Sequence, residues 1–172
     1  RKLKPSDRWN EQELHEAFSL QKAGLFGRLS NTGIGKLAVG VSGDVDSALA
    51  LLAACGTLDM LGLPRENLIA VVLPGFDTAD AAYYNALKLI SVLGVSLREI
   101  SVKDSVLQHL ANIGRDTSNL SYDDDQFLDA QTRERSIVLF DLADQEGALV
   151  VGTSDLSEIA LGRCTFGGDH MS

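Results

Sequence analysis

The stretch Gly40-Val41-Ser42-Gly43-Asp44-Val45-Asp46-Ser47 separates two runs of apolar residues. The run that enters it, residues 37–41, is short and rich in valine, which is typical of a buried strand. The run that leaves it, residues 48–55, is longer and rich in alanine and leucine, which predicts a buried helix. A turn from a strand into a helix aims the unpaired N–H groups of the first helical turn at one spot. The stretch therefore predicts an anion-binding site at residues 40–47.

Asp44 supports a second interpretation of the same turn. Aspartate is a good helix N-cap, because its carboxylate accepts hydrogen bonds from the N–H groups of the first helical turn. An ordinary strand, turn and helix capped by Asp44 would need no ligand. The local sequence leaves both interpretations open.

The composition limits the class of protein. The chain has 172 residues, which suggests one domain, and 45% of them are hydrophobic, which favours a packed core. The net charge of −9 and the lack of a basic stripe argue against nucleic acid as the main partner. We expect no membrane partner, since no stretch is long and apolar enough for a span and no signal peptide is visible. Cys55 and Cys164 form no CxxC motif, so we expect free thiols in a reducing cytoplasm.

Short apolar runs alternate with longer helical patterns along the chain. The expected strands lie at residues 37–41, 68–73, 96–102 and 148–151. The expected helices lie at residues 11–29, 45–62, 78–93, 103–112, 126–146 and around Glu158. The first helix could break at Gly24, and a turn is expected at residues 31–35. This alternation predicts an α/β fold, a doubly wound parallel sheet with helices on both faces.

Polar clusters follow three of the expected strands, at residues 42–47, 74–78 and 152–158. In doubly wound folds, ligands bind beyond the carboxyl ends of the strands, at a switch in strand order. We therefore expect the three clusters to meet around one site. The aspartate run at residues 123–125 is interpreted as a solvated loop, because it lacks the spacing of a calcium loop.

Arg133 and Arg135 lie two residues apart on the expected long helix, so they point in different directions. At most one of them is expected to reach a ligand pocket. The other is expected to form an ion pair at the surface.

Several motifs together resemble the NAD+ synthetases, specifically the synthetase domain of their glutamine-dependent branch, within the N-type ATP pyrophosphatases. The loop at 40–47 resembles the pyrophosphate-binding loop Ser-Gly-Gly-x-Asp-Ser. The other motifs are LPGFDT (73–78), QTRER (131–135), QEGALVVGT (145–153), SDLSE (154–158) and GDHMS (168–172). The similarity runs from about residue 35 to the end, and it implies the Rossmann-like fold of the adenine-nucleotide alpha-hydrolase type.

The resemblance implies ATP-dependent amidation of deamido-NAD+ to NAD+ through an adenylated intermediate, with ammonia that is free or comes from glutamine. Mg2+ would be shared by Asp46 and Glu158, since hard cations take oxygen ligands. The implied ATP contacts are Gly40, Val41, Ser42, Gly43, Asp44, Val45, Asp46, Ser47 and Thr153. The implied deamido-NAD+ contacts are Asp129, Arg133, Glu158, Arg163, Cys164, Thr165 and Phe166, and Asp169 is a further candidate. On local grounds Thr153 could instead be a helix N-cap, and Glu158 a solvated helix residue.

The resemblance also divides the chain at residue 34. Residues 1–34 would be an arm and helix that link to an upstream glutaminase domain. Residues 35–172 would be part of the ATP-pyrophosphatase domain, without the later segments that contribute to binding in the family. The family commonly dimerises, so a homo-oligomer is expected.

Four positions depart from the family pattern. Asp44 stands for glycine, Asp129 for asparagine, Arg163 for tryptophan and Phe166 for tyrosine. These departures keep a second hypothesis open, a catalytically weakened nucleotide-binding domain on the same scaffold. A third is another N-type ATP pyrophosphatase, such as a GMP synthetase. A tRNA-thiolating enzyme fits less well, because the chain is acidic and lacks a paired-cysteine motif.

Overall fold

The computed structural model describes residues 9–121 and 124–161. Its centre is a four-stranded parallel sheet with the strand order β3-β2-β1-β4. The strands are β1 (Leu37–Gly40), β2 (Leu68–Val72), β3 (Ser96–Glu99) and β4 (Leu149–Val151). The helices are α1 (Glu11–Thr32), α2 (Val45–Leu61), η2 (Arg65–Asn67), α3 (Asp80–Leu93), α4 (Lys103–Asn112), α5 (Asp125–Glu146) and α6 (Leu156–Leu161). The predicted parallel α/β fold is confirmed.

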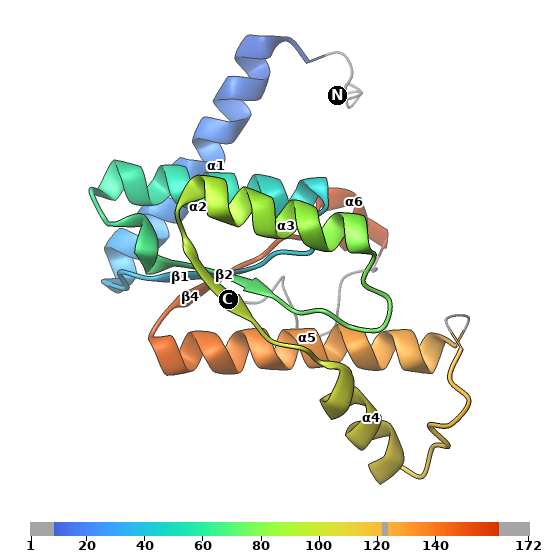
Figure 1. Cartoon of the computed structure of the whole chain (residues 1–172). Helices are drawn as coiled ribbons and strands as arrows, with labels where there is room; N and C mark the ends of the chain where they lie inside the picture. The colour runs from blue at the N-terminus through green and yellow to red at the C-terminus, as the bar shows by residue number, and fades with distance from the viewer. Residues whose placement is uncertain (1–8, 122–123, 162–172) are drawn as a thin grey trace.

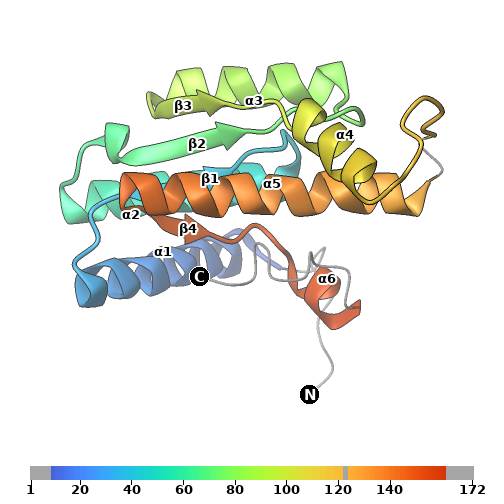
Figure 2. The same cartoon turned by 90° about the horizontal axis from the view of Figure 1, so that it is seen from below.

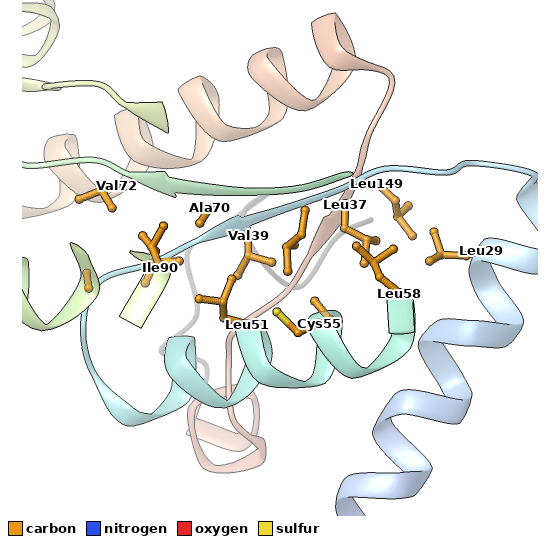
Figure 3. Close-up of a cluster of buried hydrophobic side chains, with 14 residues drawn as sticks. Leu29, Leu37, Val39, Leu51, Cys55, Leu58, Ala70, Val72, Ile90 and Leu149 are labelled. Atoms are coloured by element: carbon orange, nitrogen blue, oxygen red, sulfur yellow. The ribbon is translucent and has the colours of Figure 1, made fainter. Parts of the chain in front are cut away.

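Helices cover both faces of the sheet. α2 and α3 lie on one face, with α1 beside α2, and α5 runs along the other face (Figures 1 and 2). Successive residues of β1 alternate between the two layers. Leu37 and Val39 pack into the cluster that contains Leu51 and Leu58 of α2 (Figure 3), whereas Ala38 packs against Leu139 on α5. A strand buried on both faces reads as a continuous apolar run, which explains the sequence of residues 37–41.

The strand order reverses at β1. The chain builds outward from β1 to β2 and then β3, and α5 returns it to the opposite side of β1, where β4 pairs in parallel. The direction of the strand order therefore changes between β1 and β4. Open α/β sheets bind ligands outside the carboxyl ends of the strands at such a switch point.

Three local expectations were wrong. α1 shows no break at Gly24 and continues to Thr32, so the turn expected at residues 31–35 begins later, at the left-handed cap Gly33. A capping box between Asn10 and Glu13 starts this helix, and the cost of about 1 kcal/mol for a helical glycine does not interrupt it. β3 ends at Glu99 rather than at residue 102. Val102 is instead fully buried before α4, where its N–H donates to the carbonyl of Pro74 (3.1 Å).

α1 is attached to the rest of the fold through its C-terminal half. Leu29 is 3% exposed and joins the cluster around α2, and the hydroxyl of Thr57 donates to the carbonyl of Lys22 (3.4 Å). The domain boundary expected at residue 34 stays a prediction. Within the described ranges, none of the helices combines the length and the apolar content that a bilayer crossing requires.

Glu146 joins three elements at the end of α5, because its carboxylate accepts from Lys36 Nζ (3.0 Å) and Arg98 Nη2 (3.1 Å). The hydrogen bond from Lys36, and then that from Arg98, lowers the pKa of Glu146 below its ordinary value of 4.5. Because the pKa of Glu146 is lower in the folded protein, the unfolded chain binds a proton at this carboxylate more tightly than the folded protein does. The stabilisation is therefore fully present above the ordinary pKa of 4.5, and it is lost as the pH falls through the lowered pKa.

We therefore expect Glu146→Gln to lower the unfolding free energy at pH 7 and to lower it less at pH 3. Urea unfolding of both proteins at the two pH values measures this difference. A stability gap that stays constant between pH 7 and pH 3 would contradict the role of this carboxylate.

Candidate functional site

Residues 41–47 form a compact turn between β1 and α2. Val41 is 3% exposed and its N–H donates to the carbonyl of Val71 (2.8 Å), which extends the pairing with β2. The hydroxyl of Ser42 donates to that of Ser47 (2.9 Å), so the two serines of the motif face each other across the turn. Ser47 is 2% exposed, although it lies in the first turn of α2.

Gly43 is the point where this turn touches α3. Its φ of 93° lies in the left-handed region that favours glycine. A Cβ atom added there would lie 2.0 Å from the carbonyl oxygen of Ala82. The backbone of the turn is therefore in direct contact with the first turns of α3, and Gly43 is required both by its conformation and by the space around it.

Asp44 is the N-cap of α2, as the second interpretation of the sequence proposed. Its Oδ1 accepts from the N–H of Ser47 (2.9 Å), and its backbone is extended, with φ −87°. Burial raises the pKa of Asp44, but the hydrogen bonds from the Ser47 N–H, from the Ser42 and Ser47 hydroxyls and from the Asp46 N–H outweigh it, so the net pKa is lowered. The carboxylate is thus held as an anion at the helix N-terminus, where a phosphate would otherwise bind.

A pocket of about 620 Å³ opens beside this turn, beyond the carboxyl ends of β1, β2 and β4. This volume is in the range of small-molecule sites. Residues from the three polar clusters meet here, as expected. They lie together with residues from α3 and α5. The polar and charged lining residues are Ser42, Asp44, Asp77, Thr78, Tyr83, Asn85, Thr132, Arg135, Ser136 and Thr153.

α5 supplies one wall of the pocket, and the sequence did not assign a role to Arg135 in this wall or to Gln131 behind it. Arg135 lines the pocket, and its guanidinium donates to the carboxylate of Asp77 and to the carbonyl of Leu73. Gln131, one helical turn earlier, is fully buried and accepts from the N–H of Phe76 (2.7 Å). The spacing of four residues places both on one face of α5, and this was the signal that could have found them.

Arg133 points away from this wall, so the expected divergence of the two arginines is confirmed. Its side chain is 52% exposed and forms an i,i+4 ion pair with Asp129 (3.5 Å). The arginine that reaches this pocket is therefore Arg135, and the surface ion pair belongs to Arg133. The assignment of Asp129 and Arg133 to deamido-NAD+ stays a prediction.

The segment after β4 contributes Thr153 to the pocket. The helix that follows is capped by Asp155, which accepts from the N–H of Glu158 (2.6 Å), while the carboxylate of Glu158 accepts from the N–H of Asp155 (3.2 Å). This reciprocal capping box engages Glu158 locally, and the cap interpretation of Thr153 is wrong because Asp155 has that role.

The two expected Mg2+ ligands, Asp46 and Glu158, are exposed, and neither lines the pocket. Within residues 9–121 and 124–161, no group of three or more His, Cys, Asp or Glu side chains is arranged to hold a metal ion. A metal here would need further oxygen ligands from a bound phosphate, which is the usual arrangement for Mg2+. The predicted residues Arg163, Cys164, Thr165, Phe166 and Asp169 lie outside the described residues.

Comparison with known proteins identifies the family. The family model for NAD synthase matches residues 18–172. The chain belongs to the NAD synthase family. It is 42% identical over 165 residues to the glutamine-dependent NAD(+) synthetase of Mycobacterium leprae, an alignment that covers 94% of this chain and 24% of that protein. It is 32% identical over 134 residues to the NH(3)-dependent NAD(+) synthetase of Thermoplasma acidophilum, covering 76% of this chain and 50% of that protein.

The solved structures agree with this assignment at the level of the fold. The glutamine-dependent NAD+ synthetase from Acinetobacter baumannii, solved in complex with ADP, matches with a TM-score of 0.82 and 22% identity, over 99% of this chain and 30% of that one. The chain spans about a quarter of the length of the Mycobacterium leprae relative, which it covers to 24%. The resemblance to the NAD synthase family and its Rossmann-like fold, inferred from the motifs, is confirmed.

Proposed function

We propose that this chain is the nucleotide-binding part of an NAD+ synthetase that amidates deamido-NAD+ at the expense of ATP. In this reaction the nicotinate carboxylate attacks the α-phosphate of ATP and pyrophosphate leaves. Ammonia then displaces AMP from the adenylate and leaves the amide of NAD+. Since such transfers depend mainly on positioning and charge neutralisation, the task of this chain is to bind and orient the two nucleotides.

The observation that carries the proposal is the pocket of about 620 Å³ at the reversal of strand order, with the turn after β1 in its wall. In the proposed complex the β- and γ-phosphates lie against the N–H groups of residues 42–47 and the hydroxyls of Ser42 and Ser47, and Thr153 contacts the same nucleotide. Ser42 lines the pocket, and its hydroxyl lies 2.9 Å from that of Ser47, which supports this assignment. Asp44 is the feature that works against it.

Mg2+ fits the chemistry of the donors around the turn, because carboxylates and hydroxyls are hard oxygen ligands. We assign the ion to Asp46 and Glu158 together with phosphate oxygens of the bound nucleotide. Bound there, Mg2+ would neutralise charge that develops on the leaving pyrophosphate. Both carboxylates are exposed, and that of Glu158 would have to leave its hydrogen bond with the N–H of Asp155 to reach a bound nucleotide.

The remaining assignments rest on the resemblance of the motifs to the NAD synthase family, whose model matches residues 18–172. We assign Asp129, Arg133, Glu158 and residues 163–166 to the side that meets deamido-NAD+. The relatives include both glutamine-dependent and NH(3)-dependent enzymes, so the nitrogen is supplied either by a glutaminase domain elsewhere in the protein or as free ammonia. A homo-oligomer in the cytoplasm is part of the same proposal, and the free, buried thiol of Cys55 is compatible with a reducing compartment.

The test is binding of Mg-ATP, followed by pyrophosphate release in the presence of deamido-NAD+ and ammonia. We expect Asp46→Asn to remove the dependence of ATP affinity on Mg2+, so that its affinity in Mg2+ falls to the value measured with EDTA. The thermal midpoint should change by only a few degrees, because Asp46 is exposed. If the ATP affinity of Asp46→Asn depends on Mg2+ as that of the wild-type protein does, the assignment of the metal to Asp46 is refuted. If the wild-type protein binds no Mg-ATP, the proposed function is refuted.

A further inference from the structure

The segment between β2 and α3, residues 73–79, forms a wall of the pocket and has no regular secondary structure. We call it the β2–α3 loop. It carries Asp77 and Thr78, two of the polar groups that face the pocket. Loops without secondary structure are usually mobile, so the precision of this wall depends on what holds the loop.

Two side chains of α5 hold the loop by its backbone and by its one pocket-facing carboxylate. Arg135 donates through Nε to the carbonyl of Leu73 (3.1 Å), and through Nη1 (3.3 Å) and Nη2 to the carboxylate of Asp77. Gln131 Oε1 accepts from the N–H of Phe76 (2.7 Å). An arginine fork that engages a carboxylate with two nitrogens fixes orientation as well as distance.

Gly75 lies between these contacts. A Cβ atom added to Gly75 would lie 2.5 Å from Arg135 Nη2, 2.6 Å from Gln131 Oε1 and 2.9 Å from Asp77 Oδ1. The loop therefore passes so close to α5 that a side chain at this position would push the two α5 residues away from their partners. The requirement here is space, since Gly75 does not have a positive φ.

The buried amide of Gln131 lowers the stability of the fold, and an apolar residue at this position would not. Gln131 is fully buried, and its Nε2 has no hydrogen-bond partner among the residues that the structure describes. An unpaired buried polar group costs about 1–3 kcal/mol, which an apolar side chain of similar size would not incur. The benefit that remains is the hydrogen bond to the loop at Phe76, which suggests that the position of the loop matters.

We propose that Gln131 and Arg135 are positioning residues of the pocket: from one face of α5 they hold the β2–α3 loop in place and thereby set the affinity of the pocket for its nucleotide. Arg135 also neutralises Asp77 beside a site that would receive phosphates. Both residues act through the loop. The effect on nucleotide affinity rests on the proposed function, whereas the hold on the loop does not.

The chain contains a matched control at the other end of the same strand. Arg65 lies before β2, donates to both carboxylate oxygens of Asp59 (3.1 and 2.8 Å) and donates to the carbonyl of Leu93 (3.1 Å). It thus makes the same set of interactions as Arg135, but away from the pocket. Arg65→Lys and Arg135→Lys remove equivalent forks, so a difference between them reports the pocket and not the general loss of an ion pair.

The first measurement is amide hydrogen exchange at Phe76, made without nucleotide. We expect exchange to be at least tenfold faster in Arg135→Lys and in Gln131→Met, and unchanged in Arg65→Lys. Gln131→Met should keep the stability of the wild-type protein, because the lost hydrogen bond is offset by removal of the unpaired Nε2. Unchanged exchange at Phe76 in both α5 variants overturns the inference, whether or not the protein binds ATP.

The second measurement is Mg-ATP affinity for Arg135→Lys, Asp77→Ala and the double variant. We expect Arg135→Lys to weaken binding about tenfold in the wild-type background and to have little further effect once Asp77 is removed, since the two residues act as one unit. Equal losses in both backgrounds would mean that Arg135 contacts the nucleotide directly, which overturns a positioning role. A wild-type protein that binds no Mg-ATP while Phe76 exchange responds as expected refutes the proposed function and leaves the hold on the loop established.

Discussion

Replacing Gly43 with alanine is expected to lower the unfolding free energy by about 2–4 kcal/mol and to abolish nucleotide binding. The first part of this cost is conformational, because Gly43 has a φ of 93° that a residue with a Cβ adopts only with strain. The second part is steric. The new methyl group would meet the carbonyl oxygen of Ala82 at 2.0 Å, and backbone at that point cannot turn aside as a flexible side chain can.

The turn and α3 would therefore have to separate, and both of them form walls of the same pocket. Urea unfolding and calorimetric titration with Mg-ATP measure the two effects. Gly24→Ala is the matched control, since Gly24 lies within α1 with no atom within 4 Å of an added Cβ. That control should raise the stability slightly, by up to about 1 kcal/mol, because alanine is the better helix former. Equal stability of Gly43→Ala and the wild-type protein would refute the close approach of the turn to α3.

Replacing Asp44 with glycine is expected to strengthen binding of Mg-ATP by at least about 1.4 kcal/mol, a factor of ten. The Asp44 carboxylate already accepts from the N–H of Ser47, which is one of the donors that a phosphate would need. A carboxylate about 4 Å from one phosphate charge costs about 4 kcal/mol at an effective dielectric of 20, before a metal ion offsets part of it. The loss of the cap itself should lower the stability by only a few tenths of a kcal/mol, as is usual for glycine at an N-cap.

Asp44→Asn separates the two causes of this inhibition, because asparagine keeps the cap and removes the charge. We expect it to bind Mg-ATP with an affinity between those of the wild-type protein and Asp44→Gly. Calorimetric titration of the three proteins under the same conditions decides the point. If Asp44→Gly binds no more tightly than the wild-type protein, the substitution in the family motif is neutral and the hypothesis of a weakened site loses its main support.

Both predictions concern a turn whose sequence departs from the family pattern at one residue. The turn keeps its shape in spite of the departure, since the left-handed position is Gly43 and Asp44 is extended. The chain can therefore belong to the family and still bind Mg-ATP more weakly because of Asp44. The ion pair of Arg135 with Asp77 has the opposite effect to the charge of Asp44, because it neutralises a second carboxylate in the wall of the pocket.

Local patterns in the sequence were sufficient for the elements and their order. Each predicted strand exists, and each of the longer helices begins and ends within a few residues of its expected place. This success has a simple cause, because burial on both faces of a parallel sheet produces short continuous apolar runs and one-sided packing produces a helical period. The N-cap role of Asp44 was also readable, since capping involves only residues three apart. Two of the three failures, the turn expected at residues 31–35 and the end of β3, concern boundaries of elements, where local preference is weakest.

The tertiary structure decided which side chains join the three predicted polar clusters in the wall of the pocket. Arg135 and not Arg133 lies in its wall, because the rotation of α5 about its axis is set by the packing of Leu139 and Ala143 on the sheet. The need for glycine at position 43 likewise depends on Ala82, which belongs to a helix on the far side of β2 in the sequence. Gln131 is functional in our inference only because residues 73–79 pass over it. Contacts of this kind join residues that are distant along the chain, and they depend on how whole elements pack together, which no local period of the sequence encodes.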